Sequence, residues 1–349
     1  MLLYTGRQLP ALGEQKDIRY LGISARSVLN DPRATGMPYW SINPYIGCAI
    51  GCGYCYARFA HRYALDRALA ALPAGDAAHE AVGQMPPWLA FERRILVKRN
   101  APEVLARALR EGGPRHLALV RGEAVLVGTA TDPYQPAERR FRVTRGILET
   151  LAEHPGLRVV IITKSPLVTR DIGVLARIAR HSSVSVHMSL ITLDRELARQ
   201  LEPRAPTPEA RLRALARLRE AGIDAGVNVM PVLPGLTDHP TALEALVKRI
   251  AGVGVTFAGA CALRLRSDAR HRYFMMIDEH FPHLSARYRR AYASHHELGD
   301  RYRAGLSRVF ARICAVYGVN SHRSQDDNAD DDDRTPDRDQ LSFEFEEGG

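Results

Sequence analysis

The chain lacks long apolar runs and paired cysteines, and it has few lysines. No apolar stretch approaches the ~20 residues that a membrane-spanning helix needs, and residues 1–7 lack the charged-then-apolar layout of a signal peptide. The five cysteines are an odd number, with three clustered and two scattered, which argues against a disulfide framework and for a reducing compartment. These absences predict a soluble cytoplasmic protein without a membrane partner.

The shortage of lysine accompanies a strong positive charge. Only four of the 48 basic residues are lysines, and the formal net charge is +9. The charge is uneven, because the segment from Ser324 onward holds eleven acidic residues against two arginines, so residues 1–323 carry +18. Such an excess would attract DNA or RNA. An arginine-rich compositional bias would produce the same excess, so both interpretations stay open.

Three of the cysteines lie within eight positions. Cys48, Cys52 and Cys55 follow the segment Asn43-Pro44-Tyr45-Ile46 in a loop punctuated by glycines. Thiolates this close together can converge on one centre, and they suit iron–sulfur clusters, zinc or copper(I). No fourth cysteine follows nearby, and a cluster with three cysteine ligands leaves one iron open to a small molecule. The alternative is a zinc site in which His61 is the fourth ligand, and the loop alone favours neither.

Apolar strands and amphipathic helices alternate along most of the chain. The strands are expected at residues 39–43, 124–128, 158–163, 183–190, 225–230 and 255–265. The helices are expected at residues 102–110, 138–152, 167–179, 208–221 and 241–251. This alternation indicates βαβ units with a parallel sheet, and six units are fewer than the eight of a closed barrel. The expected fold class is therefore α/β, a partial (β/α)6 TIM-type barrel.

The sequence divides into four segments. Proline and glycine breakers make residues 1–38 an irregular N-terminal extension, and residues 39–270 form the partial barrel. Residues 271–323 are expected to be a helical C-terminal region, and the acidic residues 324–349 a disordered tail. A length of 349 residues, 46% of them hydrophobic, accommodates one large α/β domain with these extensions.

Polar or turn-forming motifs follow five of the expected strands. They are the cysteine loop, the segment 129–136, Thr163-Lys164-Ser165-Pro166, Ser189-Leu190-Ile191-Thr192 and Pro231-Val232-Leu233-Pro234-Gly235. A parallel α/β barrel carries its active site in the loops at the carboxyl ends of its strands. We therefore expect one active-site face that includes the cysteine loop.

These motifs together resemble a known enzyme family. Cys-x3-Cys-x-aromatic-Cys, with Tyr54 as the aromatic residue, resembles the signature of the radical S-adenosylmethionine superfamily. Further motifs resemble, in order and over about residues 20–320, the spore-photoproduct-lyase-like (SplB-type) enzymes: Asn-Pro-Tyr-x-Gly-Cys, Thr-Asp-Pro-Tyr-Gln-Pro-Ala-Glu, Ile-Thr-Lys-Ser, Ser-Leu-Ile-Thr-Leu-Asp, Glu-Pro-Arg-Ala-Pro-Thr-Pro and Pro-Gly-Leu-Thr-Asp-His. Several independent motifs in one order are more specific than the cysteine pattern alone.

The resemblance implies two cofactors. Cys48, Cys52 and Cys55 would hold a [4Fe–4S] cluster, and the amino and carboxylate groups of S-adenosylmethionine would chelate its open iron. An electron from a low-potential donor of the flavodoxin or ferredoxin type would then cleave the sulfonium, giving methionine and a 5′-deoxyadenosyl radical that abstracts hydrogen from a substrate. The protein itself would position and shield these groups.

The resemblance also implies cofactor-binding side chains. Tyr54 would pack beside the cluster or the adenine, and Thr131, Lys164 and Ser189 match positions that contact S-adenosylmethionine in relatives. Lys164 has a physical rationale as well, because a compact ammonium at a strand end can pair with the cofactor carboxylate. All four residues therefore belong to the predicted cofactor site.

Three catalytic residues are predicted on the substrate side. Asp132 and Tyr134 are expected at the pocket mouth, although Asp132 would alternatively hydrogen-bond the local backbone of its turn. If the sixth strand is regular, Arg264 and Cys261 face opposite sides, because side chains alternate along a strand. The resemblance assigns the barrel interior to Arg264, which makes Cys261 a small core residue.

One position departs from the family pattern. Spore photoproduct lyases carry a cysteine hydrogen donor just after the second strand, where this chain has Thr129. An O–H bond is much stronger than an S–H bond, so Thr129 is not expected to give its hydrogen to a carbon radical. Repair of spore photoproduct by that mechanism is therefore not expected.

The sequence thus predicts a radical S-adenosylmethionine enzyme, with nucleic acid to be repaired or modified as the leading substrate class. Arginine and tyrosine interleave at residues 287–292 and 301–303, a composition suited to phosphate contacts and base stacking, although a solvated helix face has it too. One alternative is the same chemistry on a protein or small metabolite. Another is a non-catalytic, zinc-stabilised nucleic-acid-binding protein.

Overall fold

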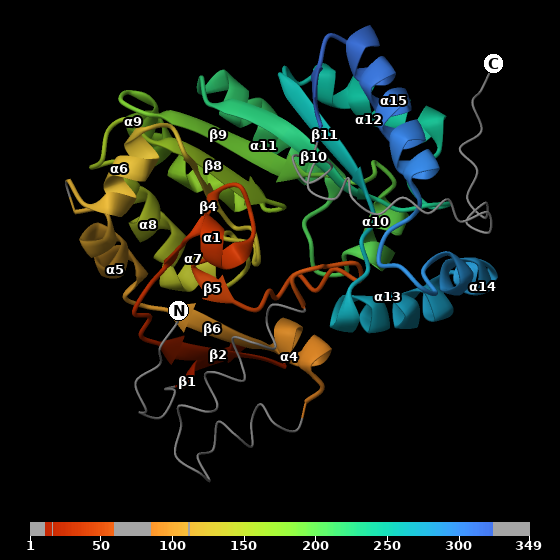
Figure 1. Ribbon diagram of the computed structural model, residues 1–349, viewed down its shortest axis with the longest axis horizontal. Helices are drawn as coiled ribbons and strands as arrows, with labels where there is room; N and C mark the ends of the chain where they lie inside the picture. Colours follow the sequence, from red (N-terminus) through yellow and green to blue (C-terminus); the bar gives the residue numbers. More distant parts are fainter. Residues whose placement is uncertain (1–10, 16, 59–84, 111, 324–349) are drawn as a thin grey trace. The chain divides into compact units, whose positions relative to one another are not determined.

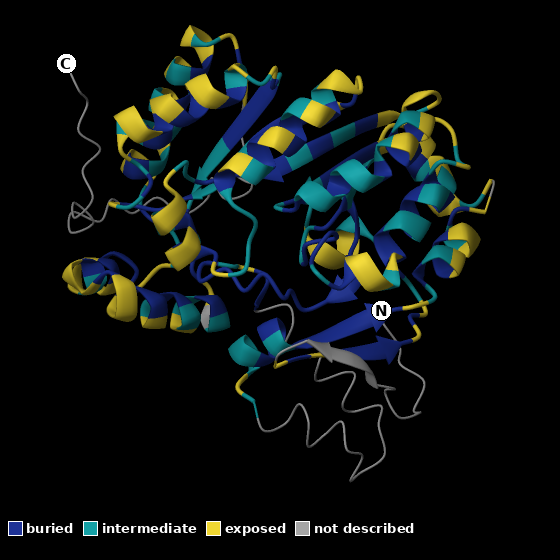
Figure 2. Ribbon diagram, turned by 180° about the vertical axis from the view of Figure 1, so that it is seen from behind, coloured by how far each residue is buried: buried dark blue, intermediate teal, exposed yellow. Residues whose placement is uncertain are grey.

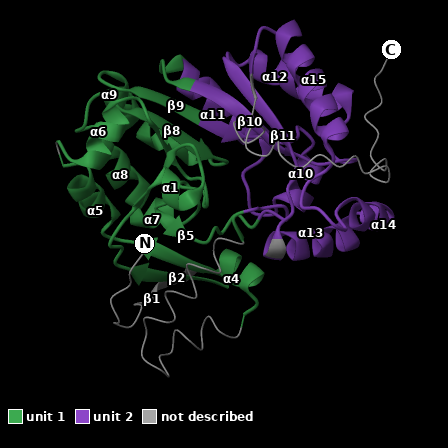
Figure 3. Cartoon of the chain, in the orientation of Figure 1, with its two compact units in different colours: residues 1–51, 57–186, 220–224 green, residues 52–56, 187–219, 225–349 purple. Residues whose placement is uncertain are grey.

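The computed structural model describes residues 11–15, 17–58, 85–110 and 112–323. The chain forms two compact units, drawn in green and purple in Figure 3. Unit 1 contains residues 1–51, 57–186 and 220–224, and unit 2 contains residues 52–56, 187–219 and 225–349. One boundary between the units falls inside the cysteine loop, where residues up to Gly51 belong to unit 1 and residues 52–56 to unit 2.

Unit 1 carries the first half of the expected barrel (Figure 1). The strand order is β8-β7-β4-β3, where β4 pairs parallel with β7, β7 pairs parallel with β8, and β3 is antiparallel to β4. The strands are β3 (Leu29–Asn30), β4 (Trp40–Ile42), β7 (Ala124–Val127) and β8 (Arg158–Thr163). The helices are α5 (Ala101–Ala108), α6 (Pro114–Val120), α7 (Glu138–Phe141), α8 (Val143–Leu151), the 3₁₀ helix η1 (Pro166–Asp171) and α9 (Ile172–Ala179).

Amphipathic faces pack these helices together. Ile147, Leu148 and Leu151 of α8 are fully buried, and α8 contacts both α5 and α9. The helix expected at residues 138–152 is two helices, α7 and α8, because Arg142 between them adopts a left-handed φ of 51°. In Figure 2 the strands are mostly coloured as buried, whereas the helices also carry exposed residues.

A second sheet in unit 1 was not expected from the sequence. Its strand order is β1-β2-β6-β5. Residues 1–38 were expected to be irregular, and this is wrong where the segment forms β1 and β2. The strands are β1 (Ala11–Gln15), β2 (Ile18–Ile23), β5 (Tyr45–Ile46) and β6 (Arg94–Lys98), accompanied by α1 (Pro32–Thr35) and α4 (Pro87–Arg93). β2 pairs with β6, more than 70 residues away, so this pairing cannot be predicted from a local sequence pattern. The antiparallel pair of β5 and β6 leads into the cysteine loop.

Unit 2 carries the second half of the barrel and the C-terminal helices. The strand order is β12-β11-β10-β9, with β10 parallel to β11 and β11 parallel to β12. The strands are β9 (Ser183–Ser189), along which the chain passes from unit 1 to unit 2, β10 (Asp224–Val232), β11 (Phe257–Ala262) and β12 (Asn320–Arg323). The helices are α10 (Arg195–Leu201), α11 (Pro208–Glu220), α12 (Pro240–Ala251), α13 (Ser267–His280), α14 (Pro282–Ala291) and α15 (Asp300–Val316).

The α/β fold class is confirmed as a partial barrel with parallel strands. Each of the six expected strands is present, and β8 has the expected bounds. Several details differ: β3 and β12 are additional strands of this sheet, and β11 runs from Phe257 to Ala262 instead of over residues 255–265. The expected tail at 324–349 lies outside the described residues, and the four-segment division stays a prediction. Among the described helices, none has the length and apolar character to cross a membrane.

Candidate functional site

The first side of the cysteine loop is bound to the end of the neighbouring strand in unit 1. The Asn43 side-chain amide follows β4, donates to Thr129 Oγ1 at 3.2 Å and accepts from the Ala130 backbone N–H at 2.8 Å. Lys98 of β6 donates from Nζ to the Asn43 carbonyl at 2.7 Å. Lys98 is buried, and this burial lowers the pKa of its amine to about 8. The start of the loop is therefore held by buried polar contacts.

The backbone around Cys48 is held by the second strand-end motif. Thr131 donates from Oγ1 to the Gly47 carbonyl at 2.7 Å, and Gln135 donates to the same carbonyl at 3.1 Å. The Gln135 side-chain oxygen accepts from the Ala49 backbone N–H at 2.9 Å, and the Cys48 N–H donates to the Phe91 carbonyl at 2.8 Å. Thr131, predicted as a cofactor contact, thus lies against the cysteine loop, and its cofactor role stays a prediction.

Gln135 is a site residue that the sequence did not identify. Its side chain is fully buried, and it also donates to Thr131 Oγ1 at 2.9 Å. A fully buried amide needs hydrogen-bond partners, and here the loop backbone supplies them. The only available signal was its place directly after the Asp-Pro-Tyr turn.

The second side of the loop is anchored in unit 2 by a buried ion pair. The Tyr54 hydroxyl donates to Glu202, and the other oxygen of Glu202 accepts from the Arg211 guanidinium. Arg211 also donates from Nη1 to the Ser189 carbonyl at 2.9 Å, so β9 and the loop share one network. Burial and the carboxylate of Glu202 raise the pKa of Tyr54 well above its usual value. The Tyr54 hydroxyl therefore stays protonated and anchors the cysteine loop to Glu202.

A glycine permits close packing on the same side of the loop. A Cβ atom at Gly53 would lie 2.3 Å from Sδ of Met276 in α13, and the Gly53 N–H donates to the Leu201 carbonyl at 2.9 Å. Cys52 is buried and Cys55 is half-buried. The loop therefore fits tightly against its support without a side chain at position 53.

Asp132 has the role of a turn-stabilising carboxylate. It accepts from the Thr163 hydroxyl and the Tyr134 N–H, both at 2.8 Å, and from the Lys164 N–H at 2.7 Å. Burial raises the pKa of Asp132, and these three donors counteract the rise. The structure thus brings together two predicted residues, Asp132 and Lys164, through the backbone of Lys164. This geometry matches the alternative role expected for Asp132, in which its carboxylate hydrogen-bonds the local backbone. The catalytic role of Asp132 stays a prediction.

Tyr134 is fully buried instead of lying at a pocket mouth. Its hydroxyl donates to Asp171 at 3.1 Å, and Arg170 bonds both Asp171 and Glu138 at 2.7 Å. The Tyr45 hydroxyl donates to Glu138 at 2.5 Å. A tyrosine finds a partner for its hydroxyl when it is buried, and Asp171 is that partner here. The geometry gives Tyr134 a positioning task, and its predicted catalytic role is not tested by these contacts.

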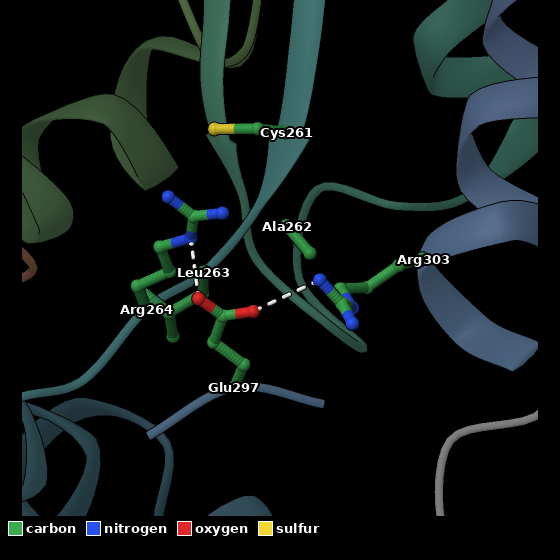
Figure 4. A pocket seen from close by; sticks show the side chains of 6 residues that line it. All are labelled: Cys261, Ala262, Leu263, Arg264, Glu297 and Arg303. Atoms are coloured by element: carbon green, nitrogen blue, oxygen red, sulfur yellow. Dashed lines mark hydrogen bonds and ion pairs between the residues drawn. The ribbon is translucent and has the colours of Figure 1, made fainter. Parts of the chain in front are cut away.

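The condition for the predicted opposition of Arg264 and Cys261, a regular strand that continues to residue 264, is not met. Because β11 ends at Ala262, strand alternation no longer applies at residue 264, and both residues line one cavity of unit 2 (Figure 4). Glu297 and Arg303 line the same cavity. Arg264 donates from Nε to Glu297 at 2.8 Å. Cys261 is half-buried and faces this cavity instead of the core.

The chemistry of the loop fits an iron–sulfur cluster. Three thiols lie within eight residues of one chain segment, and positive φ at Gly47 and Gly51 lets the backbone turn around a bound group. Over the described part of the chain, no three His, Cys, Asp or Glu side chains are arranged to hold a single metal ion. His61, the fourth ligand of the zinc alternative, lies outside the described residues, so that alternative stays a prediction.

Fold and loop define an α/β partial barrel with a thiol-rich site after its first strand. The chain belongs to the Radical SAM superfamily, whose family model matches residues 42–246. It is 35% identical over 302 residues to the uncharacterized protein Rv2578c of Mycobacterium tuberculosis, covering 86% of this chain and 81% of that protein. It is 29% identical over 221 residues to the uncharacterized protein MJ0683 of Methanocaldococcus jannaschii, covering 63% and 70%.

Solved structures of spore photoproduct lyase share this fold. A variant with bound AdoMet and dinucleoside spore photoproduct superposes with a TM-score of 0.62 at 14% identity, covering 92% of this chain and 88% of that chain. The enzyme complexed with dinucleoside spore photoproduct gives a TM-score of 0.57 at 14% identity, with the same coverage. The family expected from the sequence motifs is confirmed.

Proposed function

We propose that this protein is a radical S-adenosylmethionine enzyme that abstracts hydrogen from a nucleic-acid substrate. Cys48, Cys52 and Cys55 would hold the [4Fe–4S] cluster. When bound, the cluster supplies the electron that cleaves the sulfonium of S-adenosylmethionine and so generates the 5′-deoxyadenosyl radical. The electron would come from a low-potential donor protein of the flavodoxin or ferredoxin type.

The observation that carries the proposal is the buried support of the cysteine loop. Thr131 and Gln135 hold the Gly47 carbonyl in unit 1, while Glu202 holds the Tyr54 hydroxyl in unit 2. Each of these four side chains is buried. Groups held by packing and hydrogen bonds keep their geometry during a reaction, which a cluster-bound cofactor needs.

Lys164 and Ser189, at the ends of neighbouring strands, would supply the expected cofactor contacts. Asp132 fixes the backbone N–H of Lys164, so the lysine stem starts from a rigid point at the end of β8. Its ammonium would pair with the carboxylate of S-adenosylmethionine. Ser189 ends β9, and its carbonyl is fixed by Arg211. AdoMet in a solved spore photoproduct lyase structure of the same fold supports this assignment.

Nucleic acid is the substrate class that the charge favours. Residues 1–323 carry +18, and anionic backbones bind such surfaces through arginine. Two arginines also lie over the ring of Phe274, with Arg270 at 5.5 Å and Arg289 at 4.9 Å from its centroid. The dinucleoside spore photoproduct bound by structures of the same fold points to the same class.

The reaction after hydrogen abstraction would differ from spore photoproduct repair. Thr129 accepts a hydrogen bond from the Asn43 side chain at 3.2 Å, so its hydroxyl has a structural partner at the cysteine-loop entrance. Its strong O–H bond is also unsuited to hydrogen-atom donation. We therefore propose a lyase-like or modifying enzyme with a different final step.

The test is cofactor cleavage by the reconstituted full chain. Anaerobic reconstitution should give a brown protein with about four irons per chain, and dithionite with S-adenosylmethionine should release 5′-deoxyadenosine. The Cys52→Ala variant should lose both iron and cleavage, whereas Cys314→Ala, at a buried cysteine of α15, should keep them. A colourless protein with one bound zinc and no cleavage would overturn the proposal in favour of the zinc alternative.

A further inference from the structure

The outward side of α15 carries three exposed arginines in a row. Arg301, Arg308 and Arg312 are separated by seven and four residues, close to two turns and one turn of an α-helix, so they project from one side. The helix rises about 1.5 Å per residue, which makes this α15 row about 16 Å long. The other side of α15 packs against α12, β11 and β12, and Figure 1 shows α15 in blue beside α12 and β11.

The α15 row has no acidic partner in the described part of the chain. None of its three arginines forms a hydrogen bond or an ion pair with a described residue. Asp300, at the start of the helix, pairs with Arg303 instead. Residues 301–323 hold five arginines and no Asp or Glu. Like charges one turn apart on a helix repel each other, so an anionic chain that lies along the row is stabilising.

β12 leads the chain back along α15. Three residues separate the helix from the strand, and in this turn the Val319 N–H donates to the Cys314 carbonyl at 2.9 Å. Helix and strand also pack against each other, so they run side by side in opposite directions. β12 ends at Arg323, and its end therefore points toward the first turns of the helix.

Two contacts place the first turns of α15 at the carboxyl ends of the strands in unit 2. Arg303 lines a cavity together with the last residues of β11. The Tyr302 hydroxyl donates to Asp238, six residues after the end of β10, at 2.9 Å. Because β12 pairs parallel with β11 as far as Arg323, the chain leaves β12 at this same end of the sheet. The segment after β12 therefore starts at the Arg301 end of the row.

The segment that continues from β12 is strongly acidic. Residues 324–349 hold eleven acidic residues against two arginines, a net charge of −9, and are called the acidic segment below. Four consecutive aspartates occupy residues 330–333, seven to ten residues beyond Arg323. Seven residues of extended chain span up to about 25 Å, which exceeds the length of the row. These aspartates can therefore reach each of the three arginines.

We propose that the acidic segment docks on the α15 row of its own chain, with the aspartates at 330–333 facing Arg301, Arg308 and Arg312. One exposed ion pair contributes little, because water and salt screen it, but several charges in a row act together. Attachment at the end of the row gives the segment a high effective concentration there, which favours it over an anion that arrives from solution.

Docking has a consequence for nucleic-acid binding. A nucleic-acid strand also presents a series of negative charges that arginines neutralise, so the docked segment competes with it for the α15 row. The docking itself goes beyond the proposed function and does not depend on it. The competition rests on the proposed function for its nucleic-acid substrate.

Cross-linking of the full chain tests the docking directly. A carbodiimide condenses a carboxylate with an amine in contact with it, so Arg308→Lys provides an amine in the row that can form an amide bond with the acidic segment. Peptide mapping identifies the linked residues, and a mixture of isotope-labelled and unlabelled chains separates links within a chain from links between chains. Arg217→Lys, at an exposed position of α11 in the same unit, is the matched control.

We expect links within the chain from position 308 to residues 324–349. Their yield should exceed that of Arg217→Lys about tenfold, the size expected from two or three exposed ion pairs. In about 1 M salt, where the Debye length is about 3 Å, the two yields should become equal. Equal yields at low salt, or links between chains only, would overturn the inference.

A cycle of variants tests the competition. Binding of labelled oligothymidylate is measured for the reconstituted full chain, with the four aspartates at 330–333 changed to asparagine, with Arg308→Gln and Arg312→Gln together, and with both sets. Neutralising the aspartates should tighten binding about tenfold when the row is intact and much less when the row is removed. Equal tightening in both backgrounds would show a general effect of net charge and would contradict docking on the row.

Failure of the inference and failure of the proposed function are separable. The cross-links are measured without nucleic acid, S-adenosylmethionine or reductant, whereas release of 5′-deoxyadenosine reports the proposed chemistry. A protein that cleaves the cofactor but forms no links from position 308 refutes only the docking. A protein that forms these links but binds no oligothymidylate in any variant refutes only the nucleic-acid substrate.

Discussion

Glu202 joins Arg211 in an ion pair whose side chains are each only 1% exposed, and the same carboxylate accepts the hydroxyl of Tyr54 from the cysteine loop. Taking two charges out of water is costly, and only good geometry with further hydrogen bonds offsets that cost. Arg211 supplies those bonds by donating to the carbonyls of Pro206 and Ser189 at 2.9 Å. The pair therefore serves to fix the cysteine loop more than to add stability.

Breaking this pair should destabilise the protein strongly. Arg211→Met leaves Glu202 buried without its cationic partner, and removing one member of a buried pair costs about 3 kcal/mol or more. The midpoint of urea unfolding should fall accordingly. Arg213→Met, two residues along the same helix at an exposed position, should change the midpoint little. Equal midpoints for the two variants would contradict the structural role of the pair.

The same variant should change the cluster before the protein unfolds. Once Tyr54 loses the fixed position of Glu202, the loop is held less tightly, so the electron paramagnetic resonance spectrum of the reduced cluster should broaden. The measurement is made on reconstituted Arg211→Met below its unfolding midpoint. An unchanged spectrum in that variant would mean that the pair supports only the surrounding helices.

Gly53 should not tolerate a side chain. In Gly53→Ala the new Cβ would lie 2.3 Å from Sδ of Met276, so α13 or the loop must shift. We expect reduced iron retention after gel filtration and partial recovery in the double variant Gly53→Ala/Met276→Ala. Gly173→Ala is the control, because apart from the chain neighbours and the backbone of α9 itself nothing lies within 4 Å of its Cβ position. Full iron retention in Gly53→Ala alone would show that the contact relaxes freely.

The buried amine of Lys98 should make stability depend on pH. Burial lowers its pKa from 10.5 to about 8 in the folded protein, so between pH 8 and 10.5 the unfolded chain holds the extra proton. Stability should therefore rise with pH across this window, and the penalty is fully present below pH 8. A tenfold change in the proton affinity of one amine is equivalent to about 1.4 kcal/mol, so the whole effect amounts to at most about 3 kcal/mol.

The comparison with Lys98→Met isolates this contribution. Other groups titrate in the same range, but their effects cancel in the difference between the two proteins. Urea unfolding of both from pH 7 to 10.5 should show the wild type gaining stability relative to the variant as the pH rises. A difference that stays constant with pH would exclude a depressed pKa at Lys98.

The strands could be predicted because their apolar runs are local signals. Arg158–Thr163 is a continuous buried run with the bounds expected from the sequence. β12 was not predictable from the sequence, because Asn-Ser-His-Arg has no apolar pattern. Its strand conformation depends on parallel pairing with β11, some 60 residues earlier. Non-local pairing of this kind is decided by the tertiary fold.

The site divides in the same way. The cysteine spacing can be recognised directly in the sequence. Arg211 cannot be singled out in this way, because it is one of several arginines in the same helix. Only the approach of Glu202 and Tyr54 makes it a buried residue. Likewise strand alternation would place Arg264 and Cys261 on opposite sides, but it does not reach residue 264 because β11 stops at Ala262. The end of a strand is determined by tertiary contacts, which the periodicity of the sequence does not show.

Thr129 should act as a structural residue and not as a hydrogen donor. Thr129→Val keeps the shape but removes the acceptor of the Asn43 amide, which lies at 3.2 Å. Loss of one such bond should cost about 1 kcal/mol of unfolding free energy. Release of 5′-deoxyadenosine should continue at the wild-type rate, because the strong O–H bond of Thr129 gives no hydrogen atom to a radical. The measurement is product formation per turnover in deuterated buffer. A change in deuterium incorporation between the two proteins would instead assign the hydroxyl a direct part in the reaction.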